Sequence, residues 1–170
     1  SFFNCTVANN TADQDGDGLY CFSRDFITLK NCILRNAGDE IVGYSTPSTS
    51  VTYSCIDGGW PGEGNIDADP MFLRLWDGTG ADLRLRPGSP CIDAGTSVPS
   101  LTTDLAGHPR PMDIPGVGRE GEGAYDMGAY ERQSPDVGDV TGTLFFNYSI
   151  LWQRSESASP PAIDETEFNI

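Results

Sequence analysis

The sequence predicts an all-β solenoid, because short stretches of the chain repeat one another at regular intervals. FFNCTV, LKNCIL and TYSCID each place a Cys after a polar Asn or Ser, between residues that favour strands. Cys5 and Cys32 are 27 residues apart, Cys32 and Cys55 are 23 apart, and a copy without Cys, LFFNYSILW, spans Leu144–Trp152. A recurrence at this interval is typical of stacked repeats, and one strand in each repeat predicts the coils of a parallel β-helix.

Residues 1–57 are expected to form the coils. The strands predicted there are rich in Val, Ile, Phe, Tyr and Thr, which suit half-buried pleated positions; they are Phe2–Val7, Leu19–Phe22, Phe26–Leu34 and Val51–Ile56. No segment has a helical pattern of apolar residues longer than two turns. Asn4, Asn31 and Asn147 are predicted to form an Asn ladder at a corner, where their side chains bond backbone groups that the bend leaves unpaired.

Residues 58–133 are expected to form a loop-rich wrap over the coils, in the same domain, because Gly, Pro and Asp become dense there. Short strands are predicted within this wrap at Met71–Leu75 and Asp82–Arg86. Residues 134–170 are interpreted as a linker followed by a coil-like C-terminal arm, which contains the copy at Leu144–Trp152 and a last strand at Glu167–Ile170.

The composition restricts the partners of the chain. Its formal net charge of −15 would repel phosphate backbones, so nucleic acid is not expected as a partner. No apolar stretch approaches the roughly 18 residues that a membrane span needs. No signal peptide is visible, and the chain opens within a strand pattern, as a processed or excised piece of a longer protein would.

The five cysteines have two interpretations. An odd number cannot pair fully within one chain, and no C-x-x-C spacing indicates a zinc site. In the first interpretation, Cys5, Cys32 and Cys55 are small buried side chains stacked on successive coils. In the second, some of the cysteines form disulfides in an oxidising compartment, with a connectivity that the sequence does not give; the full set is Cys5, Cys21, Cys32, Cys55 and Cys91.

Acidic turns suggest calcium as a candidate ligand. Asp13, Asp15 and Asp17 alternate in DQDGDG as they do at the start of an EF-hand loop, but the twelfth position is Arg24, which excludes an EF-hand. A simpler calcium site or a solvated turn remains as the interpretation of this segment. The run Asp67–Pro70 is expected to form a rigid turn.

Three segments of the wrap resemble a known group of proteins. GNIDADPMF, LRLRPGSPCIDAG and DLAGHPRP followed by GAYDMGAYE are similar, in this order, to the C-terminal part of secreted bacterial right-handed parallel β-helix proteins of the choice-of-anchor type. The similarity spans roughly residues 1–132. It implies a right-handed β-helix at the cell surface or outside the cell, and it says little about activity.

Charged residues of the closing segment are expected to lock the structure. Arg110 is predicted to form a bidentate pair with one of the carboxylates of Asp104, Asp126 and Glu131. Catalysis is not expected, because the only His, His108, has no nucleophile in a recognisable motif nearby. Sequons at Asn4, Asn9 and Asn147 make these residues glycosylation candidates.

The function predicted first is structural and extracellular. The C-terminal arm is expected to add strands to the open end of a neighbouring copy, which produces head-to-tail assembly into a filament or surface matrix. A surface-anchored module that binds glycans is the alternative, and a polysaccharide lyase or hydrolase is the third interpretation. The residues predicted to mediate self-association are Phe2, Phe3, Val7, Leu144, Phe145, Phe146, Tyr148, Ile150, Trp152, Phe168 and Ile170.

Overall fold

The computed structural model describes residues 1–13, 16–21, 26–43 and 49–133, and this part of the chain is mostly sheet with almost no helix. Its one defined helical element is a 3-10 turn, η2 (Gly121–Gly123). Within the described ranges, no helix is long and apolar enough to cross a membrane. The predicted all-β class is therefore confirmed.

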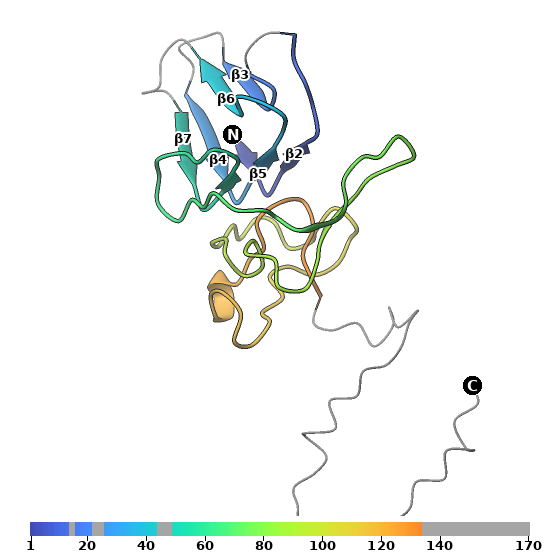
Figure 1. The fold of residues 1–170 in the computed structure, drawn as a ribbon. Coiled ribbons are helices and arrows are strands. Elements are labelled where there is room, and N and C mark those ends of the chain that lie inside the picture. Colours follow the sequence, from blue (N-terminus) through green and yellow to red (C-terminus); the bar gives the residue numbers. More distant parts are fainter. Residues whose placement is uncertain (14–15, 22–25, 44–48, 134–170) are drawn as a thin grey trace, which may run out of the picture. The chain divides into compact units, whose positions relative to one another are not determined.

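Eight short strands lie in three parallel sheets, and the chain passes through the sheets in the same order each time (Figure 1). The first sheet has the order β1 (Phe2–Phe3), β4 (Ile27–Lys30), β7 (Thr49–Thr52). The second has the order β2 (Thr6–Ala8), β5 (Ile33–Arg35), β8 (Cys55–Ile56). The third pairs β3 (Leu19–Cys21) with β6 (Ile41–Gly43).

The register of the strands places the cysteines differently from the sequence alignment. Phe2 pairs with Leu29 and Thr6 with Ile33, so Cys5 is adjacent to Cys32. Ile33 then pairs with Cys55, which makes Ser54 the next neighbour of Cys32, and the backbone N–H of Cys32 donates to Ser54 Oγ. The predicted stack is therefore confirmed for Cys5 and Cys32 and wrong for Cys55, because Ser54 occupies the third position.

A left-handed residue divides each long predicted strand into two. Asn4, Asn31 and Tyr53 have φ angles of 48°, 54° and 49°, and each lies between a strand of the first sheet and one of the second. Asn tolerates this conformation better than most residues, whereas Tyr adopts it rarely. The strands predicted at Phe2–Val7 and Val51–Ile56 are thus pairs of strands joined by a corner.

The Asn ladder is present at two of its three predicted positions. Asn31 Nδ2 donates to Asn4 Oδ1 over 3.3 Å, and the ladder then continues into the wrap. Asn31 Nδ2 donates to the Thr96 carbonyl at 2.7 Å, and Asn31 Oδ1 accepts from the Thr96 N–H at 2.9 Å. Asn4 Nδ2 donates to the Asp126 carbonyl at 3.0 Å. The third predicted member, Asn147, lies outside the described residues.

Replacing Asn31 by Ala is expected to lower the free energy of unfolding by roughly 2–4 kcal/mol. The substitution leaves buried backbone groups without hydrogen-bond partners, and Ala is strained in the left-handed conformation of this position. Urea denaturation followed by circular dichroism measures this loss. Asn31→Gly loses the same side-chain bonds but keeps the conformation, so it should recover about 1 kcal/mol. Equal stability of Asn31→Ala and the unsubstituted chain would contradict the role assigned to the ladder.

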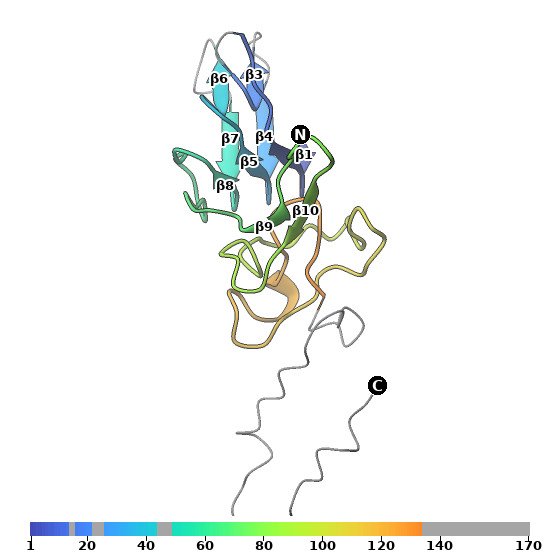
Figure 2. The ribbon, with the colours of Figure 1, turned by 45° about the vertical axis from the view of Figure 1, so that its right-hand side comes forward.

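The wrap packs against the sheets through a shared core. Its antiparallel hairpin consists of β9 (Phe72–Arg74) and β10 (Asp82–Leu85), seen beside the parallel sheets in Figure 2. One buried cluster combines residues of both regions: Ile33, Cys55, Phe72, Leu85, Cys91, Ile92 and Met127. A second cluster lies between the parallel sheets: Leu29, Cys32, Leu34, Ile41, Val51 and Ile56.

Gly128 brings the closing segment of the wrap onto the strands. Its φ is 92°, and a Cβ there would lie 2.7 Å from Thr6 Oγ1 and 2.8 Å from Ile33 Cδ1. Its N–H donates to the Asn31 carbonyl at 2.7 Å. Only Gly fits this close approach, because a side chain would collide with both strands.

Candidate functional site

A buried arginine organises the closing segment. Arg110 is 5% exposed and Glu131 is 3% exposed, and Arg110 Nε lies 3.0 Å from Glu131 Oε2. The two terminal nitrogens, Nη1 and Nη2, both donate to the Gly128 carbonyl at 3.3 Å. The predicted pairing of Arg110 with a carboxylate is present. The predicted bidentate geometry is wrong, because Nη1 and Nη2 donate to the Gly128 carbonyl and only Nε lies next to Glu131.

The carboxylates around Arg110 hold loop backbones together. Asp126 accepts the N–H of Asp93 on Oδ1 at 2.8 Å and the N–H of Arg132 on Oδ2 at 2.5 Å. Glu131 accepts the N–H of Met112 on Oε1 at 2.9 Å and the N–H of Asp126 on Oε2 at 3.2 Å. These bonds join loop segments that are distant in sequence, which is the locking role predicted for Asp126 and Glu131.

Asp104 forms a separate turn within the same region. Its Oδ1 accepts the N–H groups of Ala106 and His108, both at 2.8 Å, and its Oδ2 accepts the N–H of Glu131 at 3.1 Å. Burial raises the pKa of Asp104, but the bonds from Glu131 and His108 outweigh it and lower the pKa overall. His108 Nδ1 lies 3.4 Å from Asp104 Oδ2, with half of the imidazole side chain exposed.

Burial raises the pKa of three neighbouring carboxyl groups. The pKa of Asp126 rises to about 7 and that of Glu131 to about 8, in both cases because burial disfavours the charged form, while Arg110 partly opposes the rise. The pKa of Asp93 rises to about 6 for the same reason. Burial therefore favours retention of a proton on Glu131 and, in part, on Asp126 at neutral pH. All three carboxyl groups are buried, with exposed fractions of 0–3%.

Asp93 is a member of this cluster that the sequence did not single out as a site residue. It is fully buried at φ 49°, its Oδ2 accepts the Ile114 N–H at 3.0 Å, and its Oδ1 has no hydrogen-bond partner among the described residues. The sequence feature that could have identified Asp93 is its place in the PGSPCIDAG motif. It was not singled out because a carboxylate among turn residues is expected to stabilise the turn itself.

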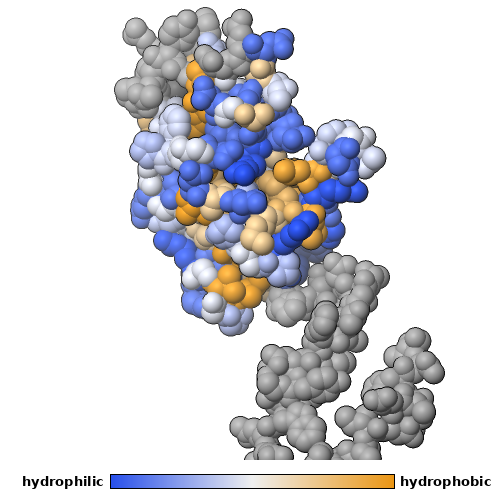
Figure 3. All heavy atoms as spheres, in the orientation of Figure 1, coloured by the Kyte–Doolittle hydropathy of each residue, from blue (hydrophilic) through white to orange (hydrophobic). Residues whose placement is uncertain are grey.

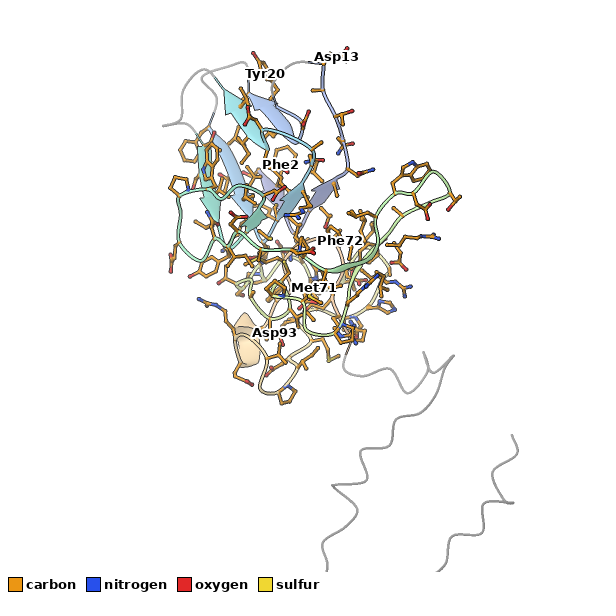
Figure 4. The ribbon with its side chains drawn as sticks, in the orientation of Figure 1. Phe2, Asp13, Tyr20, Met71, Phe72 and Asp93 are labelled. Atoms are coloured by element: carbon orange, nitrogen blue, oxygen red, sulfur yellow. The ribbon has the colours of Figure 1, made fainter. Side chains whose placement is uncertain are left out.

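The calcium prediction depends on one residue that lies outside the described ranges, Asp15. Of the other two residues of the predicted site, Asp17 accepts the Ala12 N–H on Oδ1 at 2.5 Å. Asp13 lies far from Asp93, as Figure 4 shows. Among the described residues, no group of three His, Cys, Asp or Glu side chains is placed to hold a metal ion. The site at Asp13, Asp15 and Asp17 therefore stays a prediction.

Two smaller predictions can be compared with the structure directly. Asp69 Oδ1 accepts the N–H of Met71 at 2.9 Å, so the turn predicted around Asp67–Pro70 is confirmed. Glycosylation of Asn4 is wrong, because this residue is 7% exposed and its Nδ2 is bonded inside the protein. Asn9 is exposed and remains a candidate, and Asn147 lies outside the described residues.

The two ends of the parallel sheets differ. At the far end the wrap supplies backbone partners: Tyr53 N–H donates to Glu63 O, and Ile66 bonds Ser54 and Ile56 at 2.9 and 3.0 Å. At the near end, within the described ranges, β1, β2 and β3 pair only with β4, β5 and β6. We call β1 and β2 the open edge. Phe2 and Phe3 there are 43% and 41% exposed, so the edge is apolar as well as unpaired on one side.

A hollow of about 370 Å³ lies beside the open edge. Its walls come from β1 and β2 on one side and from the wrap on the other; they are Phe3, Asn4, Cys5, Thr6, Leu101, Thr103, Asp104, Leu105, Arg110 and Ala129. Apolar side chains of Phe3, Leu101 and Leu105 make it suitable for a hydrophobic group. On the face shown in Figure 3, hydrophilic side chains predominate over the strands and hydrophobic ones reach the surface in patches over the wrap.

Comparisons of the chain with protein-family models, with curated proteins and with solved structures each found no match. The geometry therefore offers two features from which a function can be argued. The carboxylates of Asp126 and Glu131 are buried beside Arg110 and bond the backbones of loop segments. The open edge and its hollow face outward, and they form the candidate functional site.

Proposed function

We propose that the chain is a right-handed parallel β-helix protein of the secreted, choice-of-anchor type. Support comes from the repeated passage of the chain through three parallel sheets in one order. The wrap that follows is built from the segments that resemble this group, including PGSPCIDAG and GAYDMGAYE. In this interpretation each round of three strands is one coil, and the wrap closes one end of the stack.

The proposed function is head-to-tail self-association outside the cell, as a subunit of a filament or surface matrix. The observation that carries the proposal is the asymmetry of the sheets: the wrap covers the β8 end, while the open edge exposes Phe2 and Phe3. Unpaired strand edges attract further strands unless they are protected. The C-terminal copy of the repeat, Leu144–Trp152, has the sequence of such a strand.

Strand addition explains both affinity and selectivity at this site. Main-chain hydrogen bonds to β1 and β2 give the binding energy, and the adjacent hollow accepts one side chain of the incoming strand. Phe146, Ile150 and Trp152 of a neighbouring copy are the candidates for that side chain. Because the arm and the open edge are different surfaces, the contact need not close into a ring, and the product is a filament.

The net charge predicts how this assembly depends on salt. Copies that each carry a formal charge of −15 repel one another, and added salt screens that repulsion. Association is therefore expected to strengthen as the ionic strength rises from about 10 mM to about 150 mM, where the screening length falls from roughly 30 to 8 Å. An acidic surface of this kind also suits an exported protein that must stay soluble until it assembles.

Removal of residues 135–170 is expected to abolish assembly. Sedimentation velocity over a range of concentrations should show a growing series of species for the full chain and a monomer for the truncated chain. Phe3→Asp places a charge at the open edge and should weaken assembly at least tenfold, whereas Trp76→Asp, on the hairpin turn, should not. A full chain that stays monomeric at every concentration and salt level, or a truncated chain that still assembles, contradicts the proposal.

A further inference from the structure

Cys5 and Cys32 are neighbours on adjacent strands. The Asn4 N–H donates to the Lys30 carbonyl at 3.0 Å and the Ile33 N–H donates to the Cys5 carbonyl at 2.8 Å, which fixes the two cysteines in register. Adjacent strands are about 4.8 Å apart, and disulfides join Cα atoms about 4.4–6.8 Å apart. Cys32 Sγ lies 3.6 Å from the Phe2 carbonyl, so it reaches the strand before Cys5, and the Cys32 side chain is the largest influence on the pKa of Cys5.

Cys55 and Cys91 form a second pair, between β8 and the wrap. They are 1% and 0% exposed and belong to the same core cluster as Ile33 and Met127. The Cys91 side chain is also the largest influence on the pKa of Cys55, which it lowers. The Met127 N–H donates to the Cys91 carbonyl at 2.9 Å, which holds the Cys91 backbone against this core.

Cys21 is left over. It lies at the end of β3, in the third sheet, where burial raises the pKa of its thiol and Thr49 partly opposes the rise. All five cysteines are free thiols in the structure, and by position they fall into two neighbouring pairs and one single residue.

We propose that the chain forms two disulfides, Cys5–Cys32 and Cys55–Cys91, with Cys21 remaining a free thiol. The first joins β1 and β2 to the next round of strands at the open edge. The second joins the wrap to β8. This connectivity follows from the strand register and the shared core, and it is independent of the proposed self-association.

The first pair is arranged for exchange with a disulfide oxidant such as glutathione disulfide. The hydrogen bond from Cys32 lowers the pKa of Cys5 to about 6, and Cys5 is partly exposed. The Cys5 thiolate attacks one sulfur of glutathione disulfide, forms a mixed disulfide and releases one glutathione thiolate. Cys32 then loses its proton, attacks the Cys5 sulfur and releases the second glutathione. Two protein thiols are oxidised and one glutathione disulfide is reduced to two glutathione molecules.

The second pair differs in access. With both thiols buried, a soluble oxidant reaches Cys55 and Cys91 only when the wrap is open, so their disulfide is expected to form during folding. The folded, reduced protein should therefore form the Cys5–Cys32 bond within the time of an exchange experiment. The Cys55–Cys91 bond should require refolding in the oxidant.

Peptide mapping of the full chain tests the connectivity without any substitution. The reduced chain is refolded in a mixture of reduced and oxidised glutathione, the remaining thiols are alkylated, and the protein is digested without reduction. Cleavage after Lys30 and Arg35 isolates Cys32, and cleavage before Asp13 separates Cys5 from Cys21. We expect linked peptides for Cys5–Cys32 and Cys55–Cys91 and alkylation of Cys21 alone.

Substitutions give a matched control. Cys21→Ser should keep both disulfides, and the oxidised form should melt several degrees above its reduced form. Cys5→Ser should lose only the first linkage and part of that gain in Tm. The proposal is overturned if all five thiols are alkylated after refolding in the oxidant, or if the mapped bonds join Cys21 to a partner.

Discussion

At about pH 9, where the carboxyl groups of Asp126 and Glu131 are ionised, replacement of Arg110 by Met should destabilise the protein by roughly 3–5 kcal/mol, the cost of leaving buried carboxylates without their cation. Met fills a similar volume, so the loss reports the charge and the hydrogen bonds to Gly128 more than a cavity. The nearest carboxylate, on Glu131, is 3% exposed and cannot turn to solvent. Urea denaturation followed by circular dichroism at about pH 9 measures the loss.

An exposed arginine serves as the control for this substitution. Arg84 pairs with Asp82 at 2.6 Å, with about half of the Arg84 side chain exposed. Arg84→Met should cost less than about 1 kcal/mol, because exposed ion pairs contribute little. A similar small loss for Arg110→Met would refute the locking role.

A double-mutant cycle separates the pair from its surroundings. Glu131→Gln removes the charge that Arg110 neutralises, so Arg110→Met should cost less in the Glu131→Gln background than in the unsubstituted chain. A coupling free energy of about 1–3 kcal/mol is expected for a buried pair in contact. Additive losses would show that Arg110 acts through the Gly128 carbonyl and not through Glu131.

The free energy of unfolding should fall as the pH rises from about 4 to about 8, opposite to the usual behaviour of salt-bridged carboxylates. The folded pKa values of Asp126 and Glu131, about 7 and about 8, lie above the unfolded values near 3.9 and 4.3. The folded state therefore binds more protons across this window, and each proton released on raising the pH favours unfolding. A loss on the order of 2–4 kcal/mol is expected between pH 4.5 and pH 8.

Denaturant titrations at several pH values test this slope. Asp126→Asn carries no titrating group at the most buried carboxyl position, so its stability should depend less on pH than that of the unsubstituted chain. The exposed Asp67→Asn removes the same charge from the surface and should leave the slope unchanged. Stability that rises steadily from pH 4.5 to pH 8 would show that these carboxyl groups are ionised and well compensated in the folded protein.

Most of the strand-bearing segments were predictable because they combine β-branched and aromatic residues between turn signals. The strand β6 was not predicted, because IVG follows a buried Glu40 and offers too few residues for a pattern. The corner at Asn4 and Asn31 was predicted with the Asn ladder, but the corner at Tyr53 was missed. Nothing local distinguishes Tyr53 within a strand-like run, although its backbone is left-handed like that of Asn4 and Asn31.

The one-residue slip at Cys55 shows why local similarity misleads here. TYSCID aligns with LKNCIL through the shared Cys, yet the backbone aligns Tyr53 with Asn31. A corner position, and not the cysteine, is the repeating feature. In the closing segment, Arg110 was predicted to pair with one of three carboxylates, and the structure shows that Glu131 is the partner. The open edge required the strand order and could be anticipated only in outline.

The two rounds of strands also differ in length in one place. Ten residues, 9–18, connect β2 to β3, whereas five residues, 36–40, connect β5 to β6, and the other connections are equal. The wrap contacts the opposite side of the sheets, along the corner of Asn4 and Asn31. Chain length can therefore vary in the β2–β3 connection without disturbing the corner. The corner at Asn4 and Asn31 is thus constrained by contacts with the wrap, whereas the β2–β3 connection is the place where insertions can lengthen the chain.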